Sequence, residues 1–252
     1  MEIRGLSFSY GKESVLRDID FAVPQGKVTT ILGSNGSGKT TLFHLMTRNL
    51  APQGGEILLG GKPIGAIPLK EYARKVAIVG QSNTVSADIS VERLVGYGRT
   101  PFMSFFGGHT EEDRRCIEWA MDVTGVDAYR GQSVMKLSGG QRQRAFIAMA
   151  LAQNTKLLLL DEPTTWLDIR YQVEILRLIR RLNSEYGITI VMVLHDINQA
   201  IRYSDVIVGL KGGRIAFQGS PEKALTPERI ESIYGIRLEI IKTEETQYVL
   251  QA

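Results

Sequence analysis

The chain contains one short glycine-rich segment that restricts its possible folds more than any other feature. Residues 33–40 read G-S-N-G-S-G-K-T and fit the pattern G-x-x-x-x-G-K-[ST]. A run from Val28 to Leu32 that reads as a buried strand precedes the segment, and a helix-like run from Lys39 to Arg48 follows it. In such a loop the glycines let successive backbone N–H groups, together with the start of the helix, point at one anion. The sequence therefore predicts a phosphate-binding loop between a buried strand and a helix.

The members of this loop have distinct expected roles toward a nucleoside triphosphate such as ATP. Lys39 is expected to reach the β- and γ-phosphates, and the hydroxyl of Thr40 is expected to be a ligand of Mg²⁺. The other expected ATP contacts are Gly33, Ser34, Asn35, Gly36, Ser37, Gly38 and Thr41. The alternative is a glycine-rich turn that matches the pattern by chance, and the strand and helix on either side argue against it.

A second group of polar residues follows another apolar run. Leu157 to Leu160 leads directly into Asp161 and Glu162. A strand of this kind delivers its terminal side chains to the carboxyl edge of a parallel sheet, where ligands bind. Asp161 is expected to hold Mg²⁺ through its water shell, and Glu162 to polarise the attacking water. Alone, these acids could equally cap the next helix, but beside a phosphate loop they predict a catalytic site.

The order of the elements predicts an α/β protein. Apolar runs without alternation, separated by helix-like segments, indicate a mainly parallel sheet that is covered on both faces. The first forty residues read as strands and turns, and residues 82–135 read as a helical insertion. The predicted strands are residues 3–10, 15–23, 28–32, 76–79, 157–160 and 188–194, and the predicted helices are 39–48, 91–95, 111–123, 141–153 and 171–185.

Net charge, cysteine content and the length of the apolar runs argue against several other classes of protein. Thirty basic and 27 acidic residues give a net charge of +3, which is too slight to predict a nucleic-acid partner. Cys116 is the only cysteine, so no intrachain disulfide can form, and we expect a small buried side chain in a reducing compartment. No apolar run approaches the roughly 18–20 residues that span a bilayer, and the start of the chain lacks a secretory signal. A role at a membrane would therefore need a membrane-embedded partner.

A third motif, at residues 137–144, reads L-S-G-G-Q-R-Q-R. It matches the signature of the ATP-binding-cassette (ABC) family at every position, and the chain resembles this family over essentially its whole length. Two adjacent glycines open the helix that follows, and each costs roughly 1 kcal/mol of helix stability relative to alanine. Core packing gives little reason for this pair, whereas the close approach of a phosphate to the helix N-terminus does. By resemblance, the residues that contact ATP held by a second subunit are Leu137, Ser138, Gly139, Gly140 and Gln141.

The resemblance also implies roles for residues outside these motifs. Tyr10 looks like the aromatic side chain that stacks on adenine, with Val15 beside it as a weaker candidate. Gln81 looks like the glutamine that senses Mg²⁺ and the attacking water, and His195 like the histidine that contacts the γ-phosphate. Packing or an ordinary loop position is the alternative for each. The catalytic set that the resemblance implies is Lys39, Gln81, Glu162 and His195.

The same resemblance implies an architecture and a partner. We expect a P-loop NTPase fold with a mainly parallel sheet, an N-terminal antiparallel β subdomain and a helical insertion. The implied parts of this single domain are a RecA-like core with the β subdomain (1–81 and 136–220), a helical subdomain (82–135) and a C-terminal appendage (221–252). Because the signature of such a protein cannot reach its own phosphate loop, the resemblance implies a head-to-tail dimer, crossed by the loop Thr165 to Asp168.

Softer features resemble the ATPases of importers for iron-siderophore, haem or vitamin B12 complexes. They are residues 98–101, residues 161–168 with Trp166 before Leu167, and residues 195–200, 219–221 and 233–235. Such a subunit works at the cytoplasmic face of the membrane with integral permease subunits and, indirectly, a substrate-binding protein. The chain departs from the pattern at Phe102, where many members have His, and at residues 82–88, which lack the usual prolines. The alternative is a soluble ABC ATPase of iron–sulfur assembly or another non-transport complex, and the cargo is not predicted.

Overall fold

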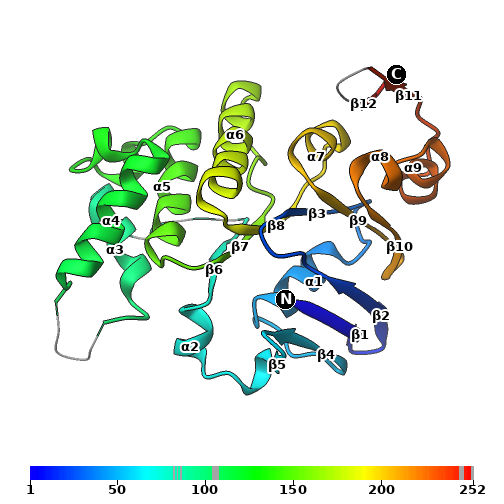
Figure 1. Ribbon diagram of the computed structural model, residues 1–252, viewed down its shortest axis with the longest axis horizontal. Coiled ribbons are helices and arrows are strands. Elements are labelled where there is room, and N and C mark those ends of the chain that lie inside the picture. The colour runs from blue at the N-terminus through cyan, green and yellow to red at the C-terminus, as the bar shows by residue number, and fades with distance from the viewer. Residues whose placement is uncertain (82, 84, 86, 104–107, 244–246, 251–252) are drawn as a thin grey trace. The chain divides into compact units, whose positions relative to one another are not determined.

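The computed structural model describes residues 1–81, 83, 85, 87–103, 108–243 and 247–250 (Figure 1). These residues form two units. The first unit combines the two ends of the chain, Met1–Ile67 and Thr189–Ala252, and the second is the continuous segment Pro68–Ile188. The resemblance implies different domain boundaries, at 81/82, 135/136 and 220/221. These boundaries stay a prediction.

An antiparallel sheet in the first unit is built from the beginning of the chain. Its strands are β1 (Glu2–Tyr10), β2 (Glu13–Ala22), β4 (Gly54–Leu59) and β5 (Lys62–Pro63), in the order β2-β1-β4-β5. Leu6 and Phe8, two residues apart on β1, are buried, as expected for a half-buried strand, and Ile3 is buried on the other side of a register shift between Ile3 and Leu6. The predicted antiparallel β subdomain is therefore present, although β4 and β5 were not predicted.

A second sheet in this unit carries the phosphate loop. Strand β3 (Val28–Gly33) pairs in parallel with β8 (Thr189–Val193) and with β9 (Val206–Lys211), and β9 pairs antiparallel with β10 (Arg214–Gly219). Every residue of β3 and β8 is buried, which agrees with sequences that are mainly apolar and do not alternate with charged residues. Helix α1 (Lys39–Met46) follows β3, and α7 (Ile197–Tyr203) follows β8.

The end of the chain forms the rest of the first unit. Its elements are α8 (Pro221–Ala224), α9 (Pro227–Tyr234), β11 (Ile240–Lys242) and β12 (Gln247–Val249), and a 3₁₀ turn, η1 (Ile64–Ala66), follows β5 nearer the start of the chain. The side chain of Asn198 on α7 donates to the carbonyl of Val249 (3.0 Å) and accepts from its N–H (2.7 Å). The amide side chain of Asn198 thus pairs with Val249 as a backbone amide would. The residues after Gly219 form short helices and strands, and their division from the core at 220/221 stays a prediction.

The second unit contains two parallel strands and most of the long helices. The strands are β6 (Val76–Val79) and β7 (Leu157–Asp161), and the helices are α2 (Leu69–Ala73), α3 (Val91–Gly96), α4 (Glu111–Thr124), α5 (Gly139–Ala152) and α6 (Ile169–Tyr186), with short 3₁₀ turns at Tyr97–Arg99, Asp127–Tyr129 and Val134–Lys136. Figure 1 shows α3, α4 and α5 side by side. Gly125 and Gly187 end α4 and α6 in the left-handed conformation, which glycine adopts without strain.

A buried ion pair fixes the segment after α3. Arg99 Nε donates to Asp113 Oδ1 at 2.7 Å, and Arg99 Nη1 donates to the carbonyl of Ala152 at 2.9 Å. Burial raises the pKa of Asp113, but hydrogen bonds from Thr110 and Arg99 outweigh it, and the net pKa is lowered. The ring of Phe102 lies 3.9 Å from the Arg99 guanidinium. Phe102, a departure from the resembled importers, is therefore a stacking partner of this buried arginine.

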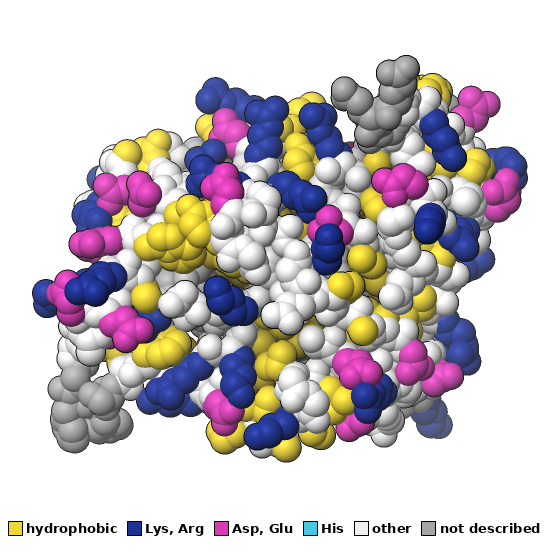
Figure 2. All heavy atoms as spheres, in the orientation of Figure 1, with side chains coloured by type: hydrophobic (Ala, Val, Ile, Leu, Met, Phe, Trp, Pro, Cys, Tyr) yellow, Lys and Arg dark blue, Asp and Glu magenta, His cyan; other side chains and the backbone are white. Residues whose placement is uncertain are grey.

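Charge is mixed on the surface. Basic and acidic side chains are interspersed on the face shown in Figure 2. The basic side chains on that face therefore do not form a continuous basic stripe.

Candidate nucleotide site

The predicted phosphate loop joins β3 to α1 in the first unit. Gly38 caps α1 with a φ of 103°, and an added Cβ there would lie 2.6 Å from Leu16 Cδ2. An added Cβ at Gly33 would lie 2.4 Å from Ser37 Oγ and 2.7 Å from the carbonyl oxygen of Leu210. Gly33 is thus required by space, because the Leu210 carbonyl oxygen belongs to the backbone, and Gly38 is required by its backbone conformation.

Lys39 is buried and turns back into the loop. Its Nζ donates to the carbonyl oxygens of Gly33 (2.8 Å) and Ser34 (3.0 Å), and the residue is only 5% exposed. The ammonium group is therefore held over the loop that is predicted to surround the phosphates. Thr40 beside it is exposed, whereas Thr41 is buried on α1.

The hairpin of β9 and β10 supports the loop from outside. The N–H of Gly213, in the turn of this hairpin, donates to the carbonyl of Ser37 at 3.2 Å. The carbonyl of Gly213 accepts from the N–H of Arg17 on β2 at 2.8 Å. The turn thus ties the phosphate loop to the antiparallel sheet of the same unit.

Three further predicted residues lie in the first unit. Tyr10, at the end of β1, is 50% exposed, and its ring meets the ring of Phe8 edge to face with centroids 5.0 Å apart. Val15 on β2 is half-buried. His195 is exposed directly after β8, and the next residue, Asp196, caps α7 by accepting from the N–H of Gln199 at 3.0 Å.

The predicted catalytic carboxylate lies in the second unit, directly after β7. Asp161 ends this strand and is 4% exposed, and Glu162 follows it at 9% exposed. Gln81 Nε2 donates to Glu162 Oε2 at 2.6 Å, and the hydroxyl of Thr165 donates to the same oxygen at 3.0 Å. The structure thus brings together Gln81 and Glu162, which the sequence placed far apart. The contact of Thr165 was not predicted, because it arises only when the chain folds back after β7.

The signature opens α5 in the second unit. Ser138 caps the helix by accepting from the N–H of Gln141 at 3.4 Å, and Gln141 Oε1 accepts from the N–H of Ser138 at 2.9 Å. An added Cβ at Gly140 would lie 2.3 Å from Tyr171 Cδ1. The interpretation that the two glycines make little sense as packing is therefore wrong for Gly140, because the ring of Tyr171 requires it. Gly139 and Ser138 are exposed at the tip of the helix.

The loop predicted to cross a dimer interface is rich in exposed apolar surface. Trp166 is 93% exposed and has a φ of 64°, and Ile169 at the start of α6 is 80% exposed. Side chains of this size are usually covered in a folded protein. Among the described residues, no helix is long enough and apolar enough to cross a bilayer.

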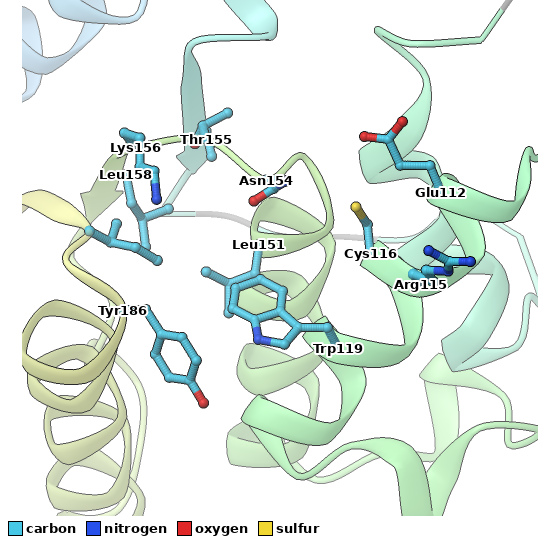
Figure 3. Close-up of a pocket in the computed structure, with 12 residues that line it drawn as sticks. Glu112, Arg115, Cys116, Trp119, Leu151, Asn154, Thr155, Lys156, Leu158 and Tyr186 are labelled. Carbon is cyan, nitrogen blue, oxygen red and sulfur yellow. The ribbon is translucent and has the colours of Figure 1, made fainter.

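A pocket in the second unit contains none of the predicted site residues (Figure 3). Its volume is about 390 Å³, and its walls come from β6, α4, the end of α5, β7 and the end of α6. Trp119 and Tyr186 meet in it edge to face, with ring centroids 5.4 Å apart. Cys116 lines this pocket and is half-buried, so it is less buried than the small buried side chain that the sequence predicted. Burial raises the pKa of its thiol.

The predicted site is thus divided between the two units. The phosphate loop, Tyr10 and His195 lie in the first, and Gln81, the two acids and the signature lie in the second. Within the described ranges, no group of three or more His, Cys, Asp or Glu side chains is arranged to hold a metal ion. Of the segment 82–88, residues 82, 84 and 86 lie outside the described residues.

Comparison with known proteins places these motifs in one family. The family model described as ABC transporter matches residues 16–165. The ferric enterobactin transport ATP-binding protein FepC of Escherichia coli (strain K12) is 45% identical over 236 residues, which cover 94% of this chain and 87% of FepC. The iron(3+)-hydroxamate import ATP-binding protein FhuC of Bacillus subtilis (strain 168) is 43% identical over 241 residues, 96% of this chain and 90% of FhuC.

A solved structure extends the likeness to the fold. The dimeric structure of MJ0796, a bacterial ABC transporter cassette, is 27% identical with a TM-score of 0.75, and the match covers 87% of this chain and 98% of that one. Sequence and fold agree over nearly the whole chain, and together with the three motifs they lead to one assignment. The chain belongs to the ABC transporter family.

Proposed function

We propose that this chain is the ATP-hydrolysing subunit of an importer for iron–siderophore complexes. The observation that carries the proposal is the identity of 43–45% to two import or transport ATP-binding proteins for ferric complexes, over more than nine tenths of the chain. A complete set of ATPase groups supports it: the phosphate loop, the two acids after β7, Gln81 and the signature. Haem or vitamin B12 complexes are the alternative cargoes of the same group of importers.

The proposed reaction is the transfer of the γ-phosphoryl group of ATP to water. The phosphate loop and Lys39 bind the triphosphate, and Tyr10 stacks on the adenine with Val15 beside it. Glu162 accepts a proton from the water whose oxygen attacks the γ-phosphorus, and the bond to the bridging oxygen of ADP breaks. The hydrogen bond from Gln81 to Glu162 supports this role, because it orients the carboxylate. His195 contacts the γ-phosphate.

Mg²⁺ fits the donors that the chain offers. Thr40, Gln81 and Asp161 supply hard oxygen atoms, and Mg²⁺ typically takes one or two protein carboxylates while substrate phosphates and water complete its shell. When bound, the ion would neutralise charge that develops on the phosphate oxygens.

A second copy of the chain completes the proposed site. In this dimer the tip of α5, with Ser138 and Gly139, faces the γ-phosphate held by the partner, so that ATP joins the two subunits. Two observations support the dimer: the exposed Trp166 and Ile169, and the dimeric form of the related cassette MJ0796. Hydrolysis removes the bridging phosphate, and the dimer loosens.

The remaining parts of the proposal concern the transporter. The RecA-like core with the β subdomain comprises residues 1–81 and 136–220, and the helical subdomain comprises 82–135. Integral permease subunits bind the cassette at the cytoplasmic face of the membrane, and a substrate-binding protein supplies the cargo. The names of the relatives, which describe import or transport, support this placement.

Uptake and hydrolysis measured with the same variants test the function. A strain that lacks the gene should lose uptake of ⁵⁵Fe supplied as a ferric siderophore, and the wild-type gene should restore it. Glu162→Gln should not restore uptake, because removal of a general base lowers kcat about 10²–10⁴-fold. The purified variant should still bind ATP, and Glu118→Gln, an exposed change on α4, should behave as the wild type.

Two results would contradict the proposal. Unchanged uptake of every ferric siderophore and haem complex in the deletion strain would exclude the importer. Co-purification of the chain with a soluble assembly complex, and with no integral membrane protein, would instead favour the iron–sulfur assembly alternative.

A further inference from the structure

The hairpin of β9 and β10 closes with a tight turn of two glycines. Lys211 pairs with Arg214 across the turn. Between them, Gly212 and Gly213 have φ angles of 52° and 76°. Two consecutive residues with positive φ match the twist of an antiparallel hairpin, and glycine adopts this conformation without strain. Gly212 is exposed, and an added Cβ there would meet nothing within 4 Å, so the turn itself explains this first glycine.

Gly213 is under a further constraint. It is buried, and an added Cβ would lie 2.1 Å from the carbonyl oxygen of Val15 and 3.3 Å from Leu16 Cα. Both are backbone atoms of β2, which cannot rotate away as the end of a flexible side chain can. A side chain at residue 213 would therefore push β2 and the turn apart.

The same glycine is hydrogen bonded on both sides. Its N–H donates to the carbonyl of Ser37 in the phosphate loop at 3.2 Å, and its carbonyl accepts from the N–H of Arg17 on β2 at 2.8 Å. Gly38, at the end of the loop, also approaches β2, since an added Cβ there would lie 3.3 Å from the Val15 carbonyl oxygen. The turn, the phosphate loop and β2 thus meet at Gly213, backbone against backbone.

This meeting point lies between the two halves of the proposed nucleotide site. The loop binds the phosphates, and Tyr10 and Val15 on the hairpin of β1 and β2 are the proposed contacts of the adenine. A ligand that touches both halves gains from both only if their separation matches its length, whereas a phosphate chain alone needs only the loop.

We infer that Gly213 is a positioning residue that sets the separation between the adenine contacts and the phosphate loop. The inference rests on the proposed nucleotide site and gives the β9–β10 hairpin a part in it. Gly213 does not touch the nucleotide; it holds β2 against the loop through two backbone hydrogen bonds and a contact that leaves no room for a side chain. The hairpin thereby favours ligands that carry both a base and a phosphate chain.

Binding of two ligands to Gly213→Ala tests the inference. ATP spans both halves of the site, and inorganic tripolyphosphate reaches only the loop. We expect the affinity for ATP to fall about tenfold, because the added Cβ displaces β2, and the affinity for tripolyphosphate to change less than about twofold. Calorimetry measures both in the Glu162→Gln background, where hydrolysis does not interfere. With Glu162 present, KM for ATP should rise and kcat should be nearly unchanged.

Gly212→Ala is the matched control. It adds the same methyl group at a positive φ in the same turn, but this group meets no neighbouring atom. Both variants weaken the turn, and only Gly213→Ala should change the ratio of ATP affinity to tripolyphosphate affinity. An equal loss of both ligands in Gly213→Ala, the same change of ratio in Gly212→Ala, or no change in either variant would overturn the inference and leave Gly213 as a residue of the turn alone.

Hydrogen exchange of the wild type gives a readout that does not depend on how well the variants fold. The N–H groups of Arg17 and Gly213 make the two hydrogen bonds at the meeting point. ATP should slow their exchange more than tripolyphosphate does, and equal slowing by both ligands would contradict the inference. Lys39→Ala separates that failure from failure of the site itself: if this variant binds both ligands as tightly as the wild type, the proposed nucleotide site is wrong.

Discussion

The surroundings of Glu162 show how single residues prepare the proposed site. Its φ of 49° lies in the left-handed region, which costs a non-glycine residue roughly 1–2 kcal/mol. Such strain persists where neighbouring contacts fix the conformation, and it is frequent at active sites. Here Gln81 and Thr165 both donate to Oε2, so the orientation of the carboxylate is set from two sides. Asp161 and Glu162 could be predicted from the motif, but the hydrogen bonds that orient Glu162 could not, since they depend on tertiary folding.

Replacement of Thr165 by valine should weaken catalysis without weakening ATP binding. The change removes the hydroxyl that donates to Glu162 Oε2 at 3.0 Å and keeps the shape of the side chain. Loss of one hydrogen bond to a charged group should lower kcat about tenfold and leave KM within about twofold. Steady-state phosphate release measures both values. Thr165→Ser keeps the donor and should restore most of the activity, whereas equal loss in both variants would show that the methyl group matters instead.

At the scale of elements, burial decided which parts of the fold could be predicted. Strands β3, β7 and β8 are buried throughout, and their runs of mainly apolar residues predicted them to within one residue at each end, although Thr29 and Thr30 interrupt the run of β3. Strands β1, β2 and β6 were also predicted, whereas β4, β5, β9 and β10 and the helices α2 and α7 offered weaker patterns. In β9, Gly209 interrupts the apolar run because Phe217 and Ile233 occupy the space of its side chain. Helix α2 has only five residues and α7 only seven, too few to show a clear helical period.

The contact between α5 and α6 gives a prediction about stability. Gly140→Ala should raise the helical propensity of α5 but destabilise the protein, because the added Cβ would lie 2.3 Å from the Tyr171 ring. Forced overpacking costs about 1–3 kcal/mol, a fall in Tm of roughly 3–9 °C. Thermal unfolding followed by circular dichroism measures it.

Two companion variants define this effect. Gly139→Ala places its Cβ 3.3 Å from the end of the flexible Leu167 side chain, so its Tm should stay close to that of the wild type. In a Tyr171→Ala background, Gly140→Ala should cost nothing further, because the opposing ring is gone. A Tm loss that persists in that background would mean that the ring of Tyr171 is not the cause.

At the scale of the whole molecule, the proposed ATP contacts demand a second copy. The loop that ends in α1 and the tip of α5 were both predicted from sequence motifs, yet the exposure of Trp166 and Ile169 could not be, because exposure depends on what packs nearby. A side chain of the size of tryptophan that is 93% exposed is expected to be covered by a partner. The proposed head-to-tail dimer supplies that cover when ATP is bound.

This dimer predicts a fluorescence change that reports on one residue. The chain has two tryptophans, and Trp119→Phe leaves Trp166 as the sole emitter. In the Glu162→Gln background, saturating ATP should double the mass measured by light scattering and shift the emission of Trp166 to shorter wavelength, because its ring leaves water. ADP should produce neither change, since it lacks the γ-phosphate that joins the subunits, and Lys39→Ala should block both. If saturating ATP left the protein monomeric with unshifted emission, the two-subunit site would be wrong, and the exposed Trp166 would need a different partner.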